Sequence, residues 1–178
     1  MSTLADLSYL ISNELLVIKI SFSKFIYEIK DEQHSYALIS ASDKAIRTLK
    51  NQWTFEKDLS WQGKFSKILI KNNKSNVVGF FTFSIGSKNL LLVMNNGFKA
   101  ELIRKRYPLL FKSDFTWQHD KKDIMTLKES TWSGEKPLKV ILLSSLNQTP
   151  ELEIMLLYGV AFSIDNRFEY ANLPLGYN

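Results

Sequence analysis

Apolar side chains occupy every face of the segment from Leu152 to Ile164, which predicts a helix that is buried on all sides. Thr149 is a favoured helix cap, and the fixed φ angle of Pro150 suits a first helical position. Glu151 and Glu153 place negative charge at the positive end of the helix dipole. Burial of each large side chain contributes roughly 1.5 to 3 kcal/mol before chain entropy is subtracted. We therefore expect this helix to form the centre of the core.

The same run is too short for a transmembrane segment, so we expect none. A spanning helix needs about 20 apolar residues, whereas this run stops at Asp165, Asn166 and Arg167. Gly159 lies in its middle and has no side chain, so we expect the backbone of another segment to approach the helix there.

Upstream of the helix, short runs rich in β-branched and aromatic residues alternate with polar turns, which predicts successive antiparallel hairpins. The turn Asn95-Asn96-Gly97 carries the strongest signal, because asparagine and glycine tolerate positive φ angles. The predicted strand pairs are residues 24–30 with 35–41, 65–71 with 77–83, 89–94 with 98–103, and 114–119 with 124–129. A last strand, 138–143, follows a turn at 134–137.

Some segments allow more than one interpretation. Apolar residues at helical spacing follow a possible cap at Ser42 and favour a short helix, although a strand through Trp53 and Phe55 also fits. The residues at this spacing are Ala45, Ile46, Leu49 and Trp53. Residues 4–11 fit either an amphipathic helix or an edge strand, and the tail 172–178 is predicted to be irregular.

A long antiparallel sheet has two edges and one apolar face to cover, and curling into a barrel solves both problems if an apolar element fills the middle. The helix after Pro150 supplies that element. We therefore predict one domain over residues 1–178, mostly β, with an antiparallel β-barrel around a central hydrophobic α-helix near the C-terminus. The alternative is an open, lipocalin-like cup with the helix outside, which does not explain apolar residues on every helix face.

This pattern resembles the tubby-like superfamily, which includes tubby C-terminal domains, plant LURP-one-related proteins and phospholipid scramblases. The resemblance lies in the many hairpins, the late tryptophan at Thr131-Trp132 before the strand Lys139 to Leu143, and the helix ending in Ser163-Ile164-Asp165. It covers roughly residues 20 to 170. It implies about a dozen antiparallel strands around a central helix, usually no catalytic residues, and in several members an affinity for membrane lipids.

The chain also departs from that family. Scramblase-like members carry cysteines that can be lipidated and an acidic calcium segment, and this sequence has no cysteine and no such segment. Scrambling and calcium dependence are therefore not expected. The phosphoinositide-binding positions of tubby proteins do not align residue by residue, so no ligand contact is carried over.

The amino-acid composition indicates the class of protein and the cellular compartment to expect. The 178 residues are 45% hydrophobic, which is ordinary for one soluble domain. Without cysteine there is neither a disulfide nor a thiolate metal site, which suits the cytoplasm. Asp6 and Glu14 interrupt the apolar residues near the N-terminus, and no basic region precedes them, so we expect no signal peptide.

The excess positive charge is local. Residues 99–112 hold five basic residues against Glu101, a net charge of +4, while the whole chain carries +5. The candidate anionic-ligand-binding residues are Lys99, Arg104, Lys105, Arg106 and Lys112. Near an anionic bilayer each basic residue contributes about 1 kcal/mol. The alternative is a solvated hairpin whose charges keep an edge strand from aggregating. The neighbouring apolar residues fit either membrane insertion or the core; they are Tyr107, Leu109, Leu110 and Phe111.

Other chemistry has weaker support. His119, Asp120 and Asp123 have the residue types of acid–base pairs or metal ligands, but Lys121 and Lys122 lie between them, as in an exposed turn. His34 also lies in a predicted turn.

The four tryptophans fit packing better than a ligand pocket; they are Trp53, Trp61, Trp117 and Trp132. Nucleic acid is not an expected partner, because no nucleic-acid-binding motif accompanies the basic segment.

The sequence thus favours a non-enzymatic, cytoplasmic module without metal or cofactor. We expect it to bind anionic phospholipid or phosphoinositide headgroups peripherally through the basic segment. A protein-interaction scaffold without lipid binding and an unrecognised hydrolase are the alternatives.

Overall fold

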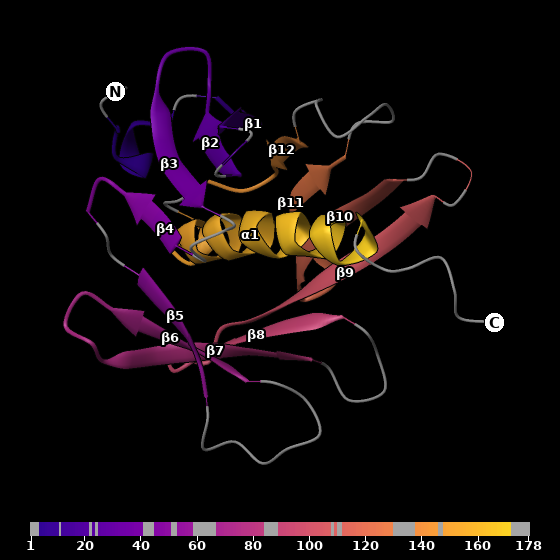
Figure 1. Ribbon diagram of the computed structural model, residues 1–178. Coiled ribbons are helices and arrows are strands. Elements are labelled where there is room, and N and C mark those ends of the chain that lie inside the picture. Colours follow the sequence, from indigo (N-terminus) through magenta and orange to yellow (C-terminus); the bar gives the residue numbers. More distant parts are fainter. Residues whose placement is uncertain are drawn as a thin grey trace.

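The computed structural model describes residues 4–10, 12–21, 23, 25–40, 45–50, 53–58, 67–83, 89–107, 109, 112–129, 138–145 and 148–171, with backbone alone at 45, 83 and 165–171. In this part of the chain, twelve antiparallel strands form one sheet that curls into a nearly closed barrel around a helix (Figure 1). The strands are β1 (Glu14–Ser21), β2 (Ile26–Lys30), β3 (Ser35–Ser40), β4 (Ala45–Thr48), β5 (Trp53–Lys57), β6 (Ile68–Asn72), β7 (Val77–Phe83), β8 (Leu90–Met94), β9 (Lys99–Tyr107), β10 (Lys112–His119), β11 (Lys122–Lys128) and β12 (Leu138–Leu142). The helix is α1 (Leu152–Ala171), and a 3-10 turn, η1, covers Leu7–Tyr9. The predicted fold class is confirmed.

The sheet order is β4-β3-β2-β1-β12-β11-β10-β9-β8-β7-β6-β5. Neighbouring strands along the chain therefore pair with each other, apart from β4 and β5, and the first strand pairs with the last. In the β1–β12 pair, Leu15 lies opposite Val140, and both side chains are fully buried. Pairing of the first strand with the last joins strands β1–β4 and strands β5–β12 into one sheet. The two edges of the described sheet are β4 and β5, which are consecutive in sequence.

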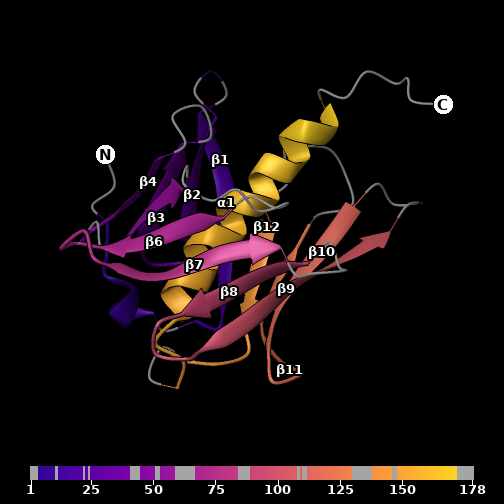
Figure 2. The same ribbon diagram turned by 90° about the horizontal axis from the view of Figure 1, so that it is seen from below.

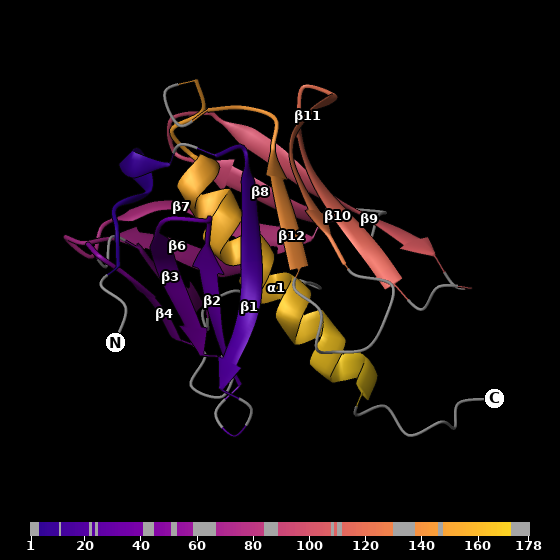
Figure 3. The ribbon, with the colours of Figure 1, turned by 90° about the horizontal axis from the view of Figure 1, so that it is seen from above.

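Helix α1 passes through the barrel, and its C-terminal end extends beyond the strands (Figures 2 and 3). Its most deeply buried side chains lie on all sides of the helix and are at most 2% exposed: Leu152, Ile154, Met155, Leu156, Leu157, Val160 and Ile164. This confirms the predicted central helix and contradicts the cup-like alternative. The helix continues past Ile164 to Ala171. It begins at Leu152, so Pro150 belongs to the preceding turn, in which the Leu152 N–H donates to the Thr149 carbonyl at 3.0 Å.

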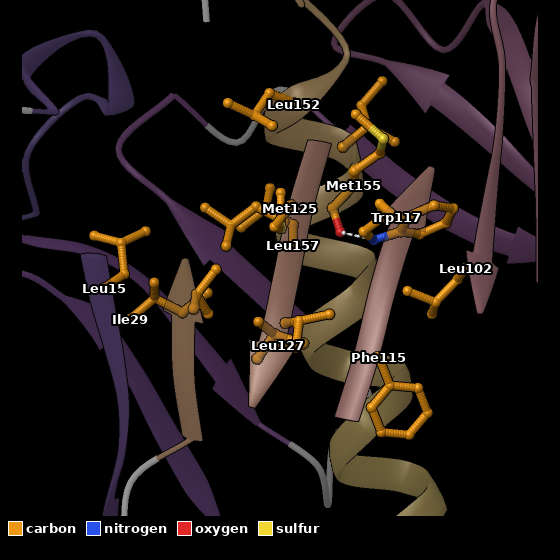
Figure 4. Packing of buried hydrophobic residues seen from close by; sticks show 14 of the residues in the cluster. Leu15, Ile29, Leu102, Phe115, Trp117, Met125, Leu127, Leu152, Met155 and Leu157 are labelled. Atoms are coloured by element: carbon orange, nitrogen blue, oxygen red, sulfur yellow. Dashed lines mark hydrogen bonds between the residues drawn. The ribbon is translucent and has the colours of Figure 1, made fainter. Parts of the chain in front are cut away.

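The helix and the barrel wall are in close contact at Trp117, which Figure 4 shows beside Met155 of the helix. The fully buried indole of Trp117 donates its Nε1–H to the Met155 carbonyl oxygen at 3.0 Å. A methyl group placed on Gly159 would lie 2.7 Å from that same Nε1 atom. The packing role of Trp117 is confirmed. Another segment does approach Gly159 closely, but it does so with the Trp117 and Leu127 side chains and not, as was predicted, with its backbone. Trp61 and Trp132 lie outside the described residues.

The predicted hairpins are confirmed as the pairs β2–β3, β6–β7, β8–β9 and β10–β11, and the predicted last strand as β12. Gly97 has φ of +91°, as its turn requires. The clearest difference in length is in β9, which was predicted to end at Ile103 but runs to Tyr107.

The predicted helix around residue 45 is wrong. Residues 45–48 form β4, where Ile46 lies opposite Ile39 of β3, and the alternative strand through Trp53 and Phe55 is β5. Pairing with β3 outweighs the helical spacing of the apolar residues, because four residues make too little helix to hold together alone. In the segment 4–11, Leu7 is buried within η1. Residue 42, the turn 134–137 and the tail 172–178 lie outside the described residues.

A buried carboxylate ties the β2–β3 turn to the core. Asp31 accepts the Tyr36 hydroxyl at 2.6 Å and the backbone N–H groups of Gln33 and His34 at 2.8 and 2.7 Å. Burial opposes the charged form of Asp31, but these hydrogen bonds outweigh it and lower the pKa of the carboxyl group. Burial, with the neighbouring carboxylate, raises the pKa of Tyr36. The ionised carboxylate is therefore part of the folded structure.

We expect Tyr36→Phe to lower the free energy of unfolding by about 1 to 3 kcal/mol at neutral pH, because one buried oxygen of Asp31 loses its donor. A carboxyl group with a lowered folded pKa contributes stability above its unfolded pKa and loses it as pH falls through the folded value. The difference between the two proteins should therefore shrink below about pH 4. Urea denaturation across pH measures it. Tyr9→Phe is the matched control, since Tyr9 is mostly exposed and contributes only a backbone carbonyl here.

Candidate functional site

The predicted basic residues lie on two adjacent strands but at different ends of the barrel. Lys99 begins β9, whereas Arg104, Lys105 and Arg106 lie near its far end, about 20 Å away at roughly 3.3 Å per residue. Lys112 begins β10 and lies opposite Tyr107. Four of the five cations therefore converge at the β9–β10 hairpin end. We call Arg104, Lys105, Arg106 and Lys112 the hairpin-end patch; Lys99 is not part of it.

Strand pairing divides the hairpin-end patch between the two faces of the sheet. Arg104 lies opposite Phe115, whose ring is fully buried, so Arg104 belongs to the face that lines the barrel. Arg106 is on the same face, at the rim, and is exposed. Lys105 and Lys112 lie on the outer face, since side chains alternate along a strand. The patch therefore curves around the barrel rim.

Arg104 is held in place by its neighbours. Its Nε and Nη2 groups donate to the Ser113 hydroxyl at 3.0 and 2.9 Å, and its guanidinium carbon lies 5.4 Å from the centre of the Phe115 ring. The backbone N–H of Ser113 in turn donates to the Glu129 carboxylate at 2.7 Å. Arg104 therefore has a packing role as well as a charge, and its replacement disturbs the barrel.

The outer cations surround an aromatic ring. Lys105 Nζ lies 5.3 Å and Lys112 Nζ 4.8 Å from the centre of the Tyr107 ring. Lys112 Nζ is also 3.8 Å from an oxygen of Asp114, and both of those side chains are mostly buried. Lys105 and Arg106 are exposed. The charge most accessible to a large anionic partner is therefore that of Lys105 and Arg106.

The histidine cluster lies in an exposed turn, as the alternative interpretation predicted. His119 stacks on Phe98 with ring centres 4.5 Å apart and donates from Nδ1 to the Lys99 carbonyl at 2.6 Å. Its Nε2 lies 3.4 Å from an oxygen of Asp120, whereas Asp123 accepts from the Gln118 amide at 2.6 Å. Among the described residues, no three histidine, aspartate or glutamate side chains are arranged to hold a metal ion. His34 lies in the β2–β3 turn, with Nδ1 4.0 Å from Asp31.

A polar cluster that the sequence did not indicate lies near the start of α1. Asp6 forms an ion pair with Lys50, and both line a small pocket together with Glu153 and Tyr36. Burial raises the pKa of Glu153, and nearby Asp6 adds to the effect. These residues are far apart in sequence, so no local pattern brings them together. Their contacts join the N-terminal segment, the end of β4 and the helix.

No family model matches this chain, and no curated protein or solved structure matches it. In the part of the chain that the structure describes, no helix combines the length and apolarity needed to cross a bilayer.

Proposed function

We propose that this chain is a non-enzymatic β-barrel module that binds anionic phospholipid or phosphoinositide headgroups peripherally. The observation that carries the proposal is the convergence of Arg104, Lys105, Arg106 and Lys112 at one hairpin end. Cations that are close together at a barrel rim contact neighbouring phosphates at the same time, whereas cations spread along a strand do not. The anionic cytoplasmic leaflet is the membrane surface that such a patch suits.

We also propose kinship with the tubby-like superfamily. Its support is architectural: twelve antiparallel strands surround a hydrophobic helix that follows the last strand. Since fold alone does not fix function, the lipid proposal depends on the hairpin-end patch and not on this kinship.

Co-sedimentation with vesicles of phosphatidylcholine and phosphatidylserine tests the proposed function. We expect Lys105→Glu/Arg106→Glu to lower the association constant for these vesicles by a factor of at least about thirty. Two basic residues contribute about 1 kcal/mol each, and 1.4 kcal/mol corresponds to a factor of about ten. Binding of the parent protein should also fall as salt is added. These two residues are chosen because they are exposed, whereas Arg104 packs on Ser113 and Phe115.

The matched control is Lys121→Glu/Lys122→Glu, which reverses two exposed charges at the opposite end of β10. It changes the net charge of the protein by the same amount, so it separates a local patch from general attraction. If the two double variants lost vesicle binding equally, the proposal that the hairpin-end patch is the binding site would be contradicted. A parent protein that does not sediment with anionic vesicles, but retains a protein partner after lipid removal, would favour a scaffold instead.

A further inference from the structure

The β9–β10 hairpin carries an apolar side chain at its extremity. Leu109 lies in the four-residue connection between Tyr107 and Lys112 and is 94% exposed, more than any other large hydrophobic side chain of the described residues. A single exposed leucine is common on protein surfaces and means little alone. Leu109 is of interest because it lies beside the hairpin-end patch.

The side chains behind Leu109 follow the order of layers in a bilayer surface. Tyr107 comes first, with an aromatic body and a polar hydroxyl, and Lys105 and Lys112 lie 5.3 and 4.8 Å from its ring centre. Tyrosine favours the level of the headgroups, while lysine and arginine favour the phosphates, with their alkyl stems along apolar surface. Along the hairpin, the apolar tip is thus followed by Tyr107 and Lys112, which lie opposite each other, and then by the other three cations of the hairpin-end patch.

The hairpin end that carries the patch lies at one end of the barrel. The ends of β9 and β10 that carry the patch project from the same side of the barrel as the C-terminal end of α1 in all three ribbon views (Figures 1–3). The turn at the other end of β10 has a different composition. Residues 120–123 pair Asp120 and Asp123 with two lysines, so their charges cancel, and no apolar residue lies among them.

We propose that the β9–β10 hairpin docks end-on to an anionic bilayer, with Leu109 entering the acyl boundary and the hairpin-end patch on the phosphates. This inference rests on the proposed function. It identifies the partner of the protein as a bilayer surface and not as a soluble phosphate compound. Transfer of one leucine out of water strengthens binding by about tenfold or more. That contribution persists at salt concentrations that screen the cations.

The absence of cysteine from the sequence allows a site-specific test. Leu109→Cys is labelled with a nitrobenzoxadiazole fluorophore and mixed with vesicles of phosphatidylcholine and phosphatidylserine. We expect the emission to shift to the blue and to be quenched by a nitroxide on the lipid acyl chain. Leu143→Cys is the control, because Leu143 is another exposed leucine, 55% accessible, and follows β12 at the opposite end of the barrel. Its label should stay in water.

A second variant measures the contribution of the side chain itself. We expect Leu109→Ser to weaken vesicle binding about tenfold and to leave the unfolding transition unchanged, since the side chain is exposed. If the parent protein sediments with the vesicles but the label at position 109 remains in water, end-on insertion is wrong and the proposed function stands. If the parent protein does not sediment, the proposed function itself is wrong. Binding of inositol hexakisphosphate as tight as vesicle binding, and unaffected by Leu109→Ser, would also overturn insertion.

Discussion

Trp117→Ala is expected to lower the free energy of unfolding by about 3 to 5 kcal/mol, a large part of the 5 to 15 kcal/mol that stabilises a typical domain. The indole is fully buried between the barrel wall and α1, and its Nε1–H bond to Met155 joins the two. Alanine removes both the packing and the hydrogen bond, and the surrounding side chains refill the cavity only in part. Urea denaturation followed by far-ultraviolet circular dichroism measures the loss.

Trp53→Ala is the control, because it removes a tryptophan that does not lie at the contact between Trp117 and the helix. Trp53 starts the edge strand β5 and is partly exposed. We expect Trp53→Ala to lower the free energy of unfolding clearly less than Trp117→Ala does. Equal losses from the two alanine variants would contradict the view that contact between helix and wall dominates the stability of this barrel.

Local turn chemistry made the hairpins predictable, whereas β1 was not predicted from its own sequence. In β1, Leu15 and Val17 point into the core, but Leu16, Ile18 and Ile20 on the outer face are also apolar. The period-two alternation that identifies a half-buried strand is therefore absent. Pairing with β2 and β12 determines the strand, and that information is distant in the chain.

The same limit applies to the candidate site. The sequence located the excess charge, but the strand was predicted to end at Ile103, so the alternation of Arg104, Lys105 and Arg106 between two faces was not expected. Only the continued pairing with β10 shows that Arg104 is anchored on Ser113. Charge count predicts that a patch exists, and backbone pairing determines which of its members a ligand reaches.

Gly159→Ala is expected to lower the free energy of unfolding by about 1 to 3 kcal/mol, although alanine is the better helix former by about 1 kcal/mol. The new methyl group would lie 2.7 Å from Trp117 Nε1 and 3.3 Å from Leu127 Cδ1. The indole ring has to move, and movement breaks its hydrogen bond to Met155. Overpacking outweighs helix propensity because the helix is enclosed by the barrel.

A double-mutant cycle isolates that clash. Phenylalanine at position 117 lacks the Nε1 atom that the methyl group meets, so Gly159→Ala should cost less in the Trp117→Phe background than in the parent. The coupling free energy is expected to be on the order of 1 to 2 kcal/mol, within the range for residues in contact. A strictly additive cycle would mean that the methyl group is accommodated without movement of the indole. The helix would then be packed less tightly against β10 than the 2.7 Å approach implies.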